Sequence, residues 1–563
     1  MRWLCSLPAA AALIAVAAPA GAATSVPAGI PHDVLAVAAS ARALPARAQF
    51  STQLGPGLRT YLVPIPAGSS ALDYSAQLRR RPGVVAAQPN TILTTAKISS
   101  PCAEAPTEQV RSIPAALNVG QNVRDTEPIA ILDTGVDQTT PELGIRVRPG
   151  FNVVADTDNT DDTDGHGTEV AAAAAGSAVE GLVAGTSPRS PILPISIYND
   201  AGQTTADWVV KGIQEAVKRG AGVINISSSS PATGNEAPSA ADVQVLQLAI
   251  ETAFDRGVIT VAAIGNEGVT DAVIPGSLPH VLTVGSSSTL GVRDNFSNLG
   301  PWLDLVAPGA NLTLPAPATV CTSGYGQANG TSFSAPEVAG GIALIRATQP
   351  KLSVSQLFDL VRQRASTPFN AAVRNDDTGF GMLDVTVGAT AAPLASEPTE
   401  PDDDVYWITR DPKGHPTYLT TSRTARLTGA VSPGKDPQDV VAVQLSRGET
   451  VTASASTQNT NGLFDLSLWN RTTGKFDIGR QSEDTRQPLR DSGGLTRAPR
   501  VTYQARTTGR YYIAVSAPDT ATPDDKSVSQ VDIDPRIAYS LSLRKTKATA
   551  IKRTVKKKAT RKK

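Results

Sequence analysis

Residues 129–137 read IAILDTGVD, a run of four apolar residues followed by an aspartate and a glycine. A short apolar run that ends in turn-forming residues indicates a strand buried on both faces. Asp133 then stands at the carboxyl end of the strand, the edge where an open α/β sheet places its functional site. On its own the signal is weak, because aspartate often ends a strand as a turn former.

The chain around this strand repeats one pattern from about residue 108 to 391, in which short β-branched runs alternate with longer Ala-rich segments. Such alternation predicts βαβ units and a parallel sheet flanked by helices. We expect strands at 129–132, 192–198, 223–226, 258–263 and 281–285, and helices at 168–175, 205–219, 240–256, 332–347 and 355–365.

A histidine between two glycines follows in residues 164–168, which read DGHGT. Glycine has no side chain to keep other backbone, or a substrate, away from the ring of His166. The other two histidines after residue 100, His280 and His415, have no comparable setting. His166 is therefore the candidate general base.

A serine at the start of a predicted helix completes the set, in residues 329–336, which read NGTSFSAP. The unpaired N–H groups and the dipole of a helix N-terminus favour a negative charge that develops beside Ser332. Pro336 fits there because the first helical turn does not need its N–H. Taken alone, Ser332 is interpreted more simply as a helix cap.

The three segments together resemble the motifs of the subtilisin-like serine proteases, the subtilases, over about half of the chain. Their order of Asp, His and Ser is also the order in subtilisin. The resemblance implies a subtilisin-like α/β fold and a serine endopeptidase that works through an acyl-enzyme intermediate. It implies that Ser332 is the nucleophile, His166 the base and Asp133 the group that orients the imidazole. Asn266 and the Ser332 N–H would form the oxyanion hole.

The resemblance also implies a groove that binds an extended peptide as an added strand. One wall of this groove matches residues 227–229, where three serines replace the more usual Ser-Leu-Gly and make the wall more polar. The residues that flank Asn266 would line the rest of the site. The candidate substrate-binding residues are Ser227, Ser228, Ser229, Ala263, Ile264, Gly265 and Glu267.

Ile264, Glu169 and Glu337 depart from the usual subtilase pattern near these motifs. Ile264 stands for a usual Ala and is predicted to narrow the primary pocket. Glu267, at the predicted rim of that pocket, is expected to favour basic side chains in the substrate slightly. Glu169 and Glu337 stand where many subtilases have His or a small residue, and we expect them to alter the surroundings of the helices more than the chemistry.

The first 22 residues have the pattern of a secretory signal peptide: Arg2, an apolar run at 9–18, and Ala-Gly-Ala before the expected cleavage point. The apolar run is shorter than the roughly 20 residues that span a bilayer, which argues against the alternative of an uncleaved membrane anchor. The sequence therefore predicts a secreted, extracellular protein.

Residues 26–100 are predicted to form a small α+β unit, with strands at 60–64 and 84–90 and a helix that ends at Arg81. Its first strand is not identifiable from the sequence. The segments YLV, GVV and PN within it resemble the inhibitory propeptides of subtilases. The resemblance implies a propeptide that assists folding and then blocks the groove, a catalytic domain at 101–391, and cleavage between Leu93 and Cys102.

The C-terminal third is predicted to be organised differently. Residues 392–404 are rich in Pro, Glu and Asp and indicate a linker, which is predicted to span 392–436. The short alternating runs of 437–544 predict a β-sandwich. The segments FDLSL, from Phe464, and GRYYIAV, from Gly509, resemble the bacterial pre-peptidase C-terminal domain.

The last residues, 545–563, have too few apolar side chains to bury a core and are expected to be a disordered basic tail. The formal net charge of the chain is 0, although residues 544–563 hold eleven Lys or Arg and no acid. Such a tail would be attracted to an anionic cell surface, with a merely solubilising tail as the alternative. A nucleic-acid partner is not expected.

Cys102 and Cys321 remain after the signal peptide, and in an oxidising compartment they are candidates for a disulfide, with two separate buried thiols as the alternative. The acidic run 156–164 suits a structural calcium ion, although such a run is more often a solvated loop. The subtilase resemblance implies protein or peptide substrates, no cofactor for the chemistry, and a monomer.

Two alternatives belong to other classes. A catalytically silent subtilase-fold protein that binds peptides or a cell surface is expected to lose Asp133, His166, Ser332 or Asn266, and all four are present. A lipase or esterase carries Gly-x-Ser-x-Gly and the order Ser, acid, His, whereas Ser332 lies in GTSFS downstream of the acid and the base.

Overall fold

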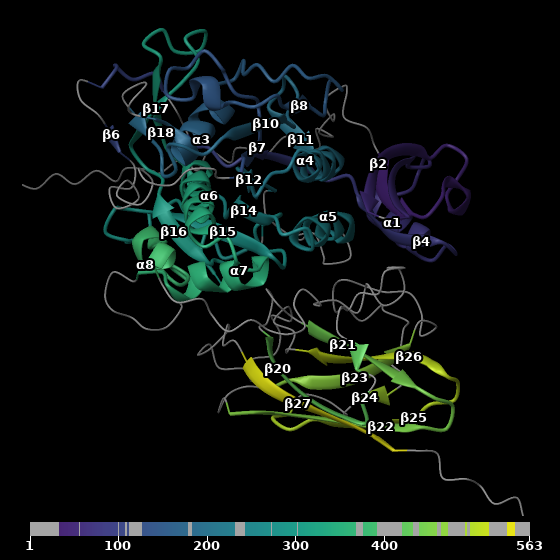
Figure 1. Ribbon diagram of the computed structural model, residues 1–563. Helices are drawn as coiled ribbons and strands as arrows, with labels where there is room; N and C mark the ends of the chain where they lie inside the picture. The colour runs from purple at the N-terminus through teal and green to yellow at the C-terminus, as the bar shows by residue number, and fades with distance from the viewer. Residues whose placement is uncertain are drawn as a thin grey trace, which may run out of the picture.

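The computed structural model describes most of residues 33–546 (Figure 1). The predicted signal peptide and nearly all of the predicted basic tail lie outside the described residues. The described ranges are 33–55, 57–98, 101–106, 110–111, 127–177, 183–230, 243–271, 273–300, 302–366, 375–390, 419–420, 422–431, 438–458, 463–470, 490–491, 496–516 and 537–546.

Within these ranges a seven-stranded parallel sheet has the order β16-β15-β14-β12-β7-β10-β8. All five strands expected from the sequence are present, and the short β8 and β16 are additional. The strands are β7 (Ile129–Asp133), β8 (Phe151–Asn152), β10 (Ile192–Ser196), β12 (Val223–Ile226), β14 (Ile259–Ala263), β15 (Val281–Ser287) and β16 (Leu305–Pro308).

Helices cover both faces of this sheet, as alternate residues of one strand demonstrate. Ile129 and Ile131 of β7 join a core cluster with α3 and α6, whereas Ala130 and Leu132 join a second cluster with α4 and α5. Each large apolar side chain buried in this way contributes about 1.5–3 kcal/mol to stability. The helices are α3 (His166–Ala175), α4 (Ala206–Lys218), α5 (Gln244–Phe254), α6 (Thr331–Thr348), α7 (Val354–Gln363) and α8 (Val385–Thr390).

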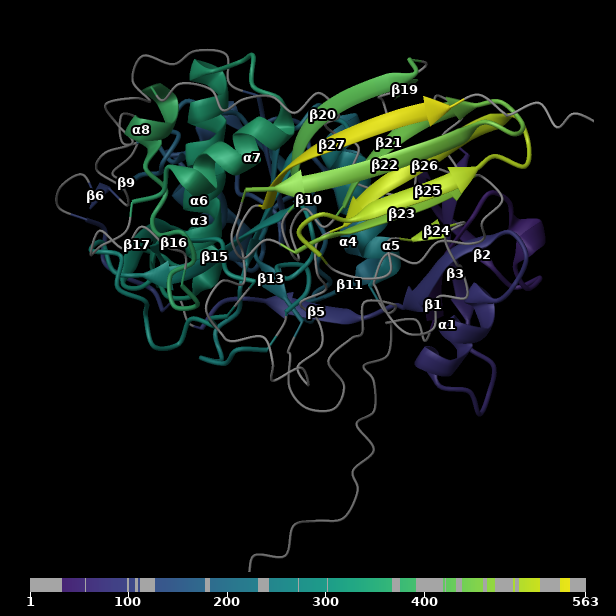
Figure 2. The same ribbon diagram turned by 90° about the horizontal axis from the view of Figure 1, so that it is seen from below.

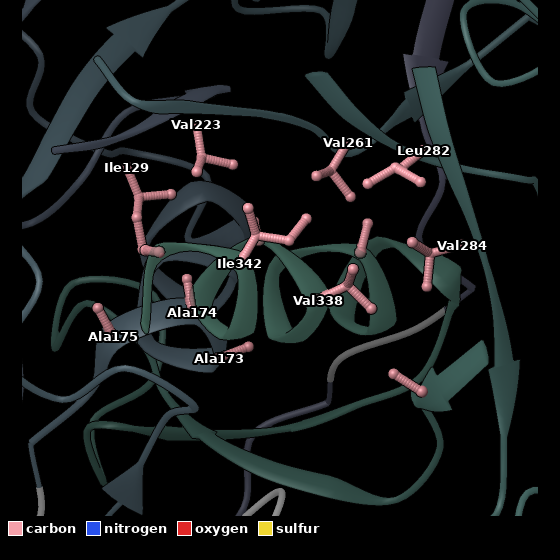
Figure 3. Packing of buried hydrophobic residues seen from close by; sticks show 14 of the residues in the cluster. Ile129, Ala173, Ala174, Ala175, Val223, Val261, Leu282, Val284, Val338 and Ile342 are labelled. Carbon is pink, nitrogen blue, oxygen red and sulfur yellow. The ribbon is translucent and has the colours of Figure 1, made fainter. Parts of the chain in front are cut away.

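Figure 3 shows the first of these clusters, in which Val338 and Ile342 of α6 face Val223 and Val261 of the sheet. Four valine and isoleucine side chains thus fill the space between helix and sheet. This packing fixes the position of α6, and with it the position of the serine at its start.

At β7 the order in which the chain adds strands to the sheet reverses. The neighbour of β7 on one side is β10 and on the other β12, so the chain builds outward from β7 both ways. Ligands of open α/β sheets bind beyond the carboxyl ends of the strands at such a switch point. Asp133, the last residue of β7, therefore lies where a functional site is expected.

The N-terminal unit is a four-stranded antiparallel sheet, β2-β3-β1-β4, with one helix. β1 and β2 were not predicted from the sequence, and for β1 the reason is that a short Ala- and Val-rich run suits a buried helix as well as a strand. The elements are β1 (Asp33–Ala38), η1 (Ala41–Ala43), β2 (Gln49–Gly55), β3 (Leu58–Pro64), α1 (Ala71–Arg79) and β4 (Val84–Pro89).

The chain then leaves this unit as β5 (Ile92–Thr95), which lies between β11 (Gln203–Thr205) and β13 (Ser228–Ser229) in a three-stranded antiparallel sheet (Figure 2). None of these three strands was predicted from the sequence. The N-terminal unit thus contributes a strand to the unit that contains β7.

The residues after β5 are fastened to a hairpin of β17 (Leu312–Pro315) and β18 (Tyr325–Ala328). The backbone of Cys102 forms an antiparallel β-bridge with Gly326. The side chain of Cys102 forms a disulfide with Cys321, which is the pairing that the sequence predicts. Two shorter strands, β6 (Val110–Arg111) and β9 (Val183–Ala184), pair in parallel, and η2 (Gly144–Arg146) is a single 3-10 turn.

Two antiparallel-rich sheets make up the C-terminal region, with the orders β19-β21-β26-β23-β24 and β20-β27-β22-β25 in the described residues. Side chains of both sheets share one core cluster. The strands are β19 (Leu419–Thr420), β20 (Thr424–Val431), β21 (Gln438–Leu445), β22 (Thr450–Thr457), β23 (Asp465–Asn470), β24 (Arg490–Asp491), β25 (Arg500–Gln504), β26 (Gly509–Ser516) and β27 (Ile537–Thr546).

One predicted boundary here is wrong. The linker was expected to reach residue 436, but β20 lies inside that stretch and pairs with β27 along its whole length. Buried positions alternate with exposed ones in the first part of β20, a weak strand signal beside the Pro- and acid-rich residues that precede it. No helix in the described part of the chain is long and apolar enough to cross a membrane.

Candidate active site

The candidate base and its carboxylate partner meet in the interior. The Nδ1 atom of His166 lies 2.7 Å from Oδ1 of Asp133, and both residues are fully buried. Burial opposes protonation of the ring, but the charge and the hydrogen bond of Asp133 outweigh it and raise the pKa of His166 above its ordinary value of 6.5. The arrangement fixes the ring orientation and stabilises its protonated form.

Two glycines let the strand and the helix approach closely enough for this contact. A Cβ atom on Gly167 would lie 2.1 Å from the carbonyl oxygen of Gly135, a distance that no side chain tolerates. The glycine that follows the histidine and the glycine that follows Asp133 by two residues therefore pack backbone to backbone. This approach explains the glycine at 167, whereas Gly135 has a φ of 143° and a Cβ atom there would lie 2.7 Å from the carbonyl oxygen of Thr160.

Within the acidic run 156–164, Asp162 caps the start of α3. Both carboxylate oxygens of Asp162 accept hydrogen bonds, Oδ1 from the N–H of Gly165 and Oδ2 from the N–H of Thr168, each at 2.9 Å. The described residues contain no group of three His, Cys, Asp or Glu side chains that suits a metal ion. The calcium hypothesis for this run therefore finds no support in its geometry.

Ser332 lies in the first turn of α6 and is fully buried. Its hydroxyl donates to the carbonyl oxygen of Ser227 at 3.2 Å, and the Ser227 hydroxyl donates back to the carbonyl of Ser332 at 2.7 Å. Nε2 of His166 is buried without a hydrogen-bond partner among the described residues. The Ser332 hydroxyl and His166 Nε2 thus make no hydrogen bond with each other, as is common before a reaction brings such groups together.

Two donors converge on one carbonyl oxygen, that of Ala96. The backbone N–H of Ser332 donates to it at 3.1 Å and the side-chain amide of Asn266 at 2.5 Å. Asn266 is oriented for this purpose, because its Oδ1 accepts from the N–H of Thr331 at 2.9 Å and from the Thr331 hydroxyl at 3.0 Å. A peptide carbonyl between two such donors is polarised and open to attack.

The peptide after Ala96 passes directly over the start of α6. A Cβ atom on Gly330 would lie 2.7 Å from the Ala96 carbonyl oxygen and 3.1 Å from Cα of Lys97. Gly330 also has a φ of 142°, a conformation that other residues rarely adopt. Glycine here makes room for the peptide that crosses the site.

The predicted serine wall pairs with this peptide through its backbone. Ser228 lies opposite Thr95 and Ser229 opposite Thr94 in the β5–β13 ladder. The N–H of Ala96 donates to the carbonyl of Ser227 at 3.0 Å. Main-chain pairing of this kind holds an extended peptide whatever its side chains are.

Two other residues predicted to line the pocket, Ala263 and Ile264, are buried in the hydrophobic core. Ile264 is fully buried in a small cluster with Val273, Leu303 and Val306, so its bulk fills the core and does not support the predicted narrowing of the pocket. Ala263 ends β14 inside the main core.

The loop that carries the oxyanion donor is held by an asparagine. The Glu267 carboxylate accepts from the Asn298 side chain at 2.7 Å and from the Asn266 N–H at 3.0 Å. Asn298 in turn donates to the carbonyl of Ile264 at 3.0 Å, and Gly265 has a φ of 100°. Glu267 therefore supports this loop and is already occupied by two donors.

Lys97 was not identified from the sequence. Its Nζ lies 3.6 Å from Oε2 of Glu169, and the N–H of the next residue, Ile98, donates to the carbonyl of Asn329 at 2.9 Å. The contact joins residues 72 positions apart in the sequence, so no local pattern announces it.

The N-terminal unit is docked by side chains that cap two helices. Oε1 of Gln88 accepts from the N–H groups of Val245 and Leu246 at the start of α5, at 2.7 and 3.1 Å. Oδ1 of Asn90 accepts from the N–H of Asp207 at the start of α4, at 2.9 Å. These bonds satisfy helix donors that would otherwise lack partners within the chain, and they hold β5 in place.

Part of this chain is similar to known proteins. Residues 125–389 match the subtilase family, Peptidase S8. The chain is 33% identical over 279 residues to the major intracellular serine protease of Bacillus subtilis (strain 168), covering 47% of this chain and 82% of the relative. It is 31% identical over 251 residues to subtilisin of Bacillus pumilus, covering 44% of this chain and 85% of the relative. A crystal structure of a lanthipeptide protease aligns with 47% of this chain and 86% of its own, with a TM-score of 0.41 and 24% identity.

Proposed function

The chain belongs to the subtilase family and is a serine-type endopeptidase, and from this premise we propose that it is made as a secreted precursor that cuts itself between Ala96 and Lys97. Residues 33–96 would then be an inhibitory propeptide. The cleavage point falls within the interval from Leu93 to Cys102 that the sequence predicts.

One observation carries the proposal: the Ala96 carbonyl oxygen accepts from both Ser332 N–H, at 3.1 Å, and Asn266 Nδ2, at 2.5 Å. These are the two donors expected to bind the oxyanion. The residues before Ala96 pair with β11 and β13 as a substrate strand would. The segment therefore has the position of a bound substrate rather than that of a structural strand alone.

In the proposed reaction the Ser332 hydroxyl oxygen attacks the carbonyl carbon of Ala96, and His166 takes the hydroxyl proton. The Ser332 N–H and Asn266 stabilise the resulting oxyanion, a contribution of about 3 kcal/mol for one such donor in subtilisin. His166 returns the proton to the leaving amine of Lys97. Water, deprotonated by His166, then attacks the acyl-enzyme and frees Ser332. Asp133 keeps the ring oriented throughout.

The same groove would then accept other proteins. Backbone pairing with Ser228 and Ser229 supports binding of extended segments with varied side chains. Ala96 and Leu93 are the buried residues of the bound strand, at 3% and 1% exposure. We expect a small residue before the scissile bond and an apolar one three positions earlier.

Export rests on the sequence of residues 1–22, and attraction to an anionic cell surface on residues 545–563. The disulfide between Cys102 and Cys321 suits an oxidising, extracellular destination. The enzyme would act there as a monomer on protein or peptide substrates. Subtilases need no cofactor for catalysis.

Mass spectrometry of the full precursor and of its Ser332→Ala variant tests the proposal, together with labelling by a fluorophosphonate. We expect the unaltered protein to yield a chain that begins at Lys97 and carries the label on Ser332. The variant should stay uncut and unlabelled. If protein freed of residues 33–96 takes no label, the proposed active site is wrong and a catalytically silent peptide-binding protein becomes the better account.

A further inference from the structure

We propose that Glu169 forms an acidic subsite that selects a basic residue immediately after the scissile bond. The inference rests on the proposed function, since it takes the Ala96–Lys97 bond as a substrate bond. Lys97 occupies the position just after that bond, and its Nζ lies 3.6 Å from Oε2 of Glu169. The Glu169 side chain is only 3% exposed, whereas that of Lys97 is 22% exposed.

The position of Glu169 follows from helix geometry. α3 begins at His166, and Glu169 follows three residues later, so the two side chains lie on the same helix face. The carboxylate therefore stands beside the leaving-group side of the site. A substrate peptide that binds in the same way as β5 therefore places the side chain that follows its scissile bond beside Glu169.

A purely structural role is the competing explanation, because acidic residues stabilise the first turn of a helix. That role is already filled in α3. Asp162 accepts from the N–H groups of Gly165 and Thr168, each at 2.9 Å, and so provides the negative charge at this helix end. A second buried carboxylate adds little to the helix, but it gives the subsite a charge.

The energetics favour selection, since a carboxylate so little exposed to water needs a nearby positive charge. Lysine or arginine at this position supplies it. An apolar side chain at this position does not make the ion pair with Glu169, and an acidic side chain is repelled by it. We expect about tenfold faster cleavage with Lys than with Ala, equivalent to 1.4 kcal/mol, and the slowest cleavage with Glu.

The charges of Lys97 and Glu169 also affect the pKa of His166. Among the smaller influences on the pKa of His166, Lys97 lowers it and Glu169 raises it. A basic residue in the subsite therefore offsets the effect of Glu169 on His166, which helps to keep the ring neutral and able to accept the serine proton.

Self-cleavage of the full precursor tests the subsite through variants of Lys97. The single variants change the substrate segment and leave the catalytic domain unaltered. Lys97→Arg should cut at a rate close to the original, Lys97→Ala about tenfold more slowly, and Lys97→Glu most slowly. The charge-swapped double variant Lys97→Glu with Glu169→Lys should recover much of the rate lost in Lys97→Glu. A merely structural Glu169 predicts no such recovery.

The mature enzyme gives a second test with octapeptides ILTTAXIS, the sequence of residues 92–99 with X at position 97. The ratio of kcat/KM for X = Lys to X = Ala should be about ten. It should fall towards one in Glu169→Gln and stay near ten in the control Asp158→Asn, which removes an 81% exposed acid.

Equal cleavage of the Lys and Ala peptides by the unaltered enzyme would overturn the inference while leaving the proposed function intact. No cleavage of any peptide, together with no fluorophosphonate labelling, would overturn both. A ratio that Glu169→Gln leaves unchanged would show that another group selects the basic residue, and the assignment to Glu169 would be wrong.

Discussion

Two buried histidines in this chain make the same contact with a carboxylate, yet only one of them is a candidate catalyst. His166 lies 2.7 Å from Asp133 through Nδ1, and His280 lies 2.7 Å from Glu251 through Nδ1. All four residues are buried. The pair alone therefore does not define an active site.

The difference lies in what surrounds the second face of each ring. The ring of His280 stacks on Phe254 at 4.1 Å and meets the edge of Phe358, so it belongs to the hydrophobic core. The ring of His166 lies instead 5.5 Å from that of Phe333, the residue that follows Ser332 at the start of α6. Function comes from the neighbouring nucleophile and donors, and the histidine–carboxylate pair only supports them.

The largest expected effect comes from removing each ring. His166→Ala should lower kcat by about 10⁶-fold, the magnitude known for the equivalent loss in subtilisin, with little change in melting temperature. His280→Ala should leave the activity of folded protein largely intact but destabilise it by about 3 kcal/mol, because it opens a cavity beside Phe254.

Active-site titration, which counts folded competent enzyme, combined with thermal unfolding separates the two outcomes. A loss of turnover per active site in His280→Ala comparable to that in His166→Ala would break the comparison, because both pairs would then serve catalysis.

The next effect concerns the carboxylates. Asp133→Asn should lower kcat by about 10⁴-fold, because the amide no longer stabilises the protonated ring. Glu251→Gln should cost only about 1–2 kcal/mol of stability, since it weakens one buried hydrogen bond. Single-turnover rates and urea unfolding of both variants measure these values. Equal losses of kcat in the two variants would contradict the assignment of Asp133 to catalysis and of Glu251 to stability.

A smaller effect is expected for the donor that only the first site possesses. Asn266→Ala should lower kcat by about 10²–10³-fold with KM nearly unchanged, since the side-chain amide acts on the oxyanion more than on the bound substrate. Asn298→Ala, which removes a partner of Glu267 without touching Ala96, should cost less activity. A rise in KM at constant kcat would assign Asn266 to substrate binding instead.

The sequence predicts most of the chemistry because the motifs are local. Asp133, His166 and Ser332 each stand beside a glycine or at a helix start, and such signals need only a few neighbouring residues. The same holds for the five expected strands of the parallel sheet, which are short runs rich in β-branched and other apolar residues.

Long-range contacts are what the sequence could not predict. His280 has no local motif, and its partner Glu251 is 29 residues away on α5. β5 was not predicted as a strand because ILTT is short, and its pairing depends on residues more than 100 positions later. Glu169 was expected to affect the surroundings of its helix more than the chemistry, since nothing near it in the sequence indicates a contact with Lys97.

The smallest predicted effect is the position of the acid limb of the pH profile. Burial opposes protonation of His166, but Asp133 outweighs it and raises the pKa above 6.5, with Glu169 raising it further and Lys97 lowering it. The base must be neutral to accept a proton, so self-cleavage should fall as the pH drops through this raised pKa. The midpoint should lie above 6.5.

Stability should change in the opposite direction. A histidine whose folded pKa is raised contributes stability below its unfolded pKa and loses it as the pH rises through the folded value. The melting temperature of the Ser332→Ala precursor, which cannot cut itself, should therefore carry a His166 component that declines over the range in which self-cleavage of the unaltered precursor increases. In Ser332→Ala combined with Asp133→Asn that component should shrink, because the main cause of the raised pKa is gone. A cleavage midpoint at or below pH 6.5 would mean that the effect of burial on the pKa of His166 outweighs the effect of Asp133. His166 would then be distinguished from other histidines by its neighbours alone, and not by a raised pKa.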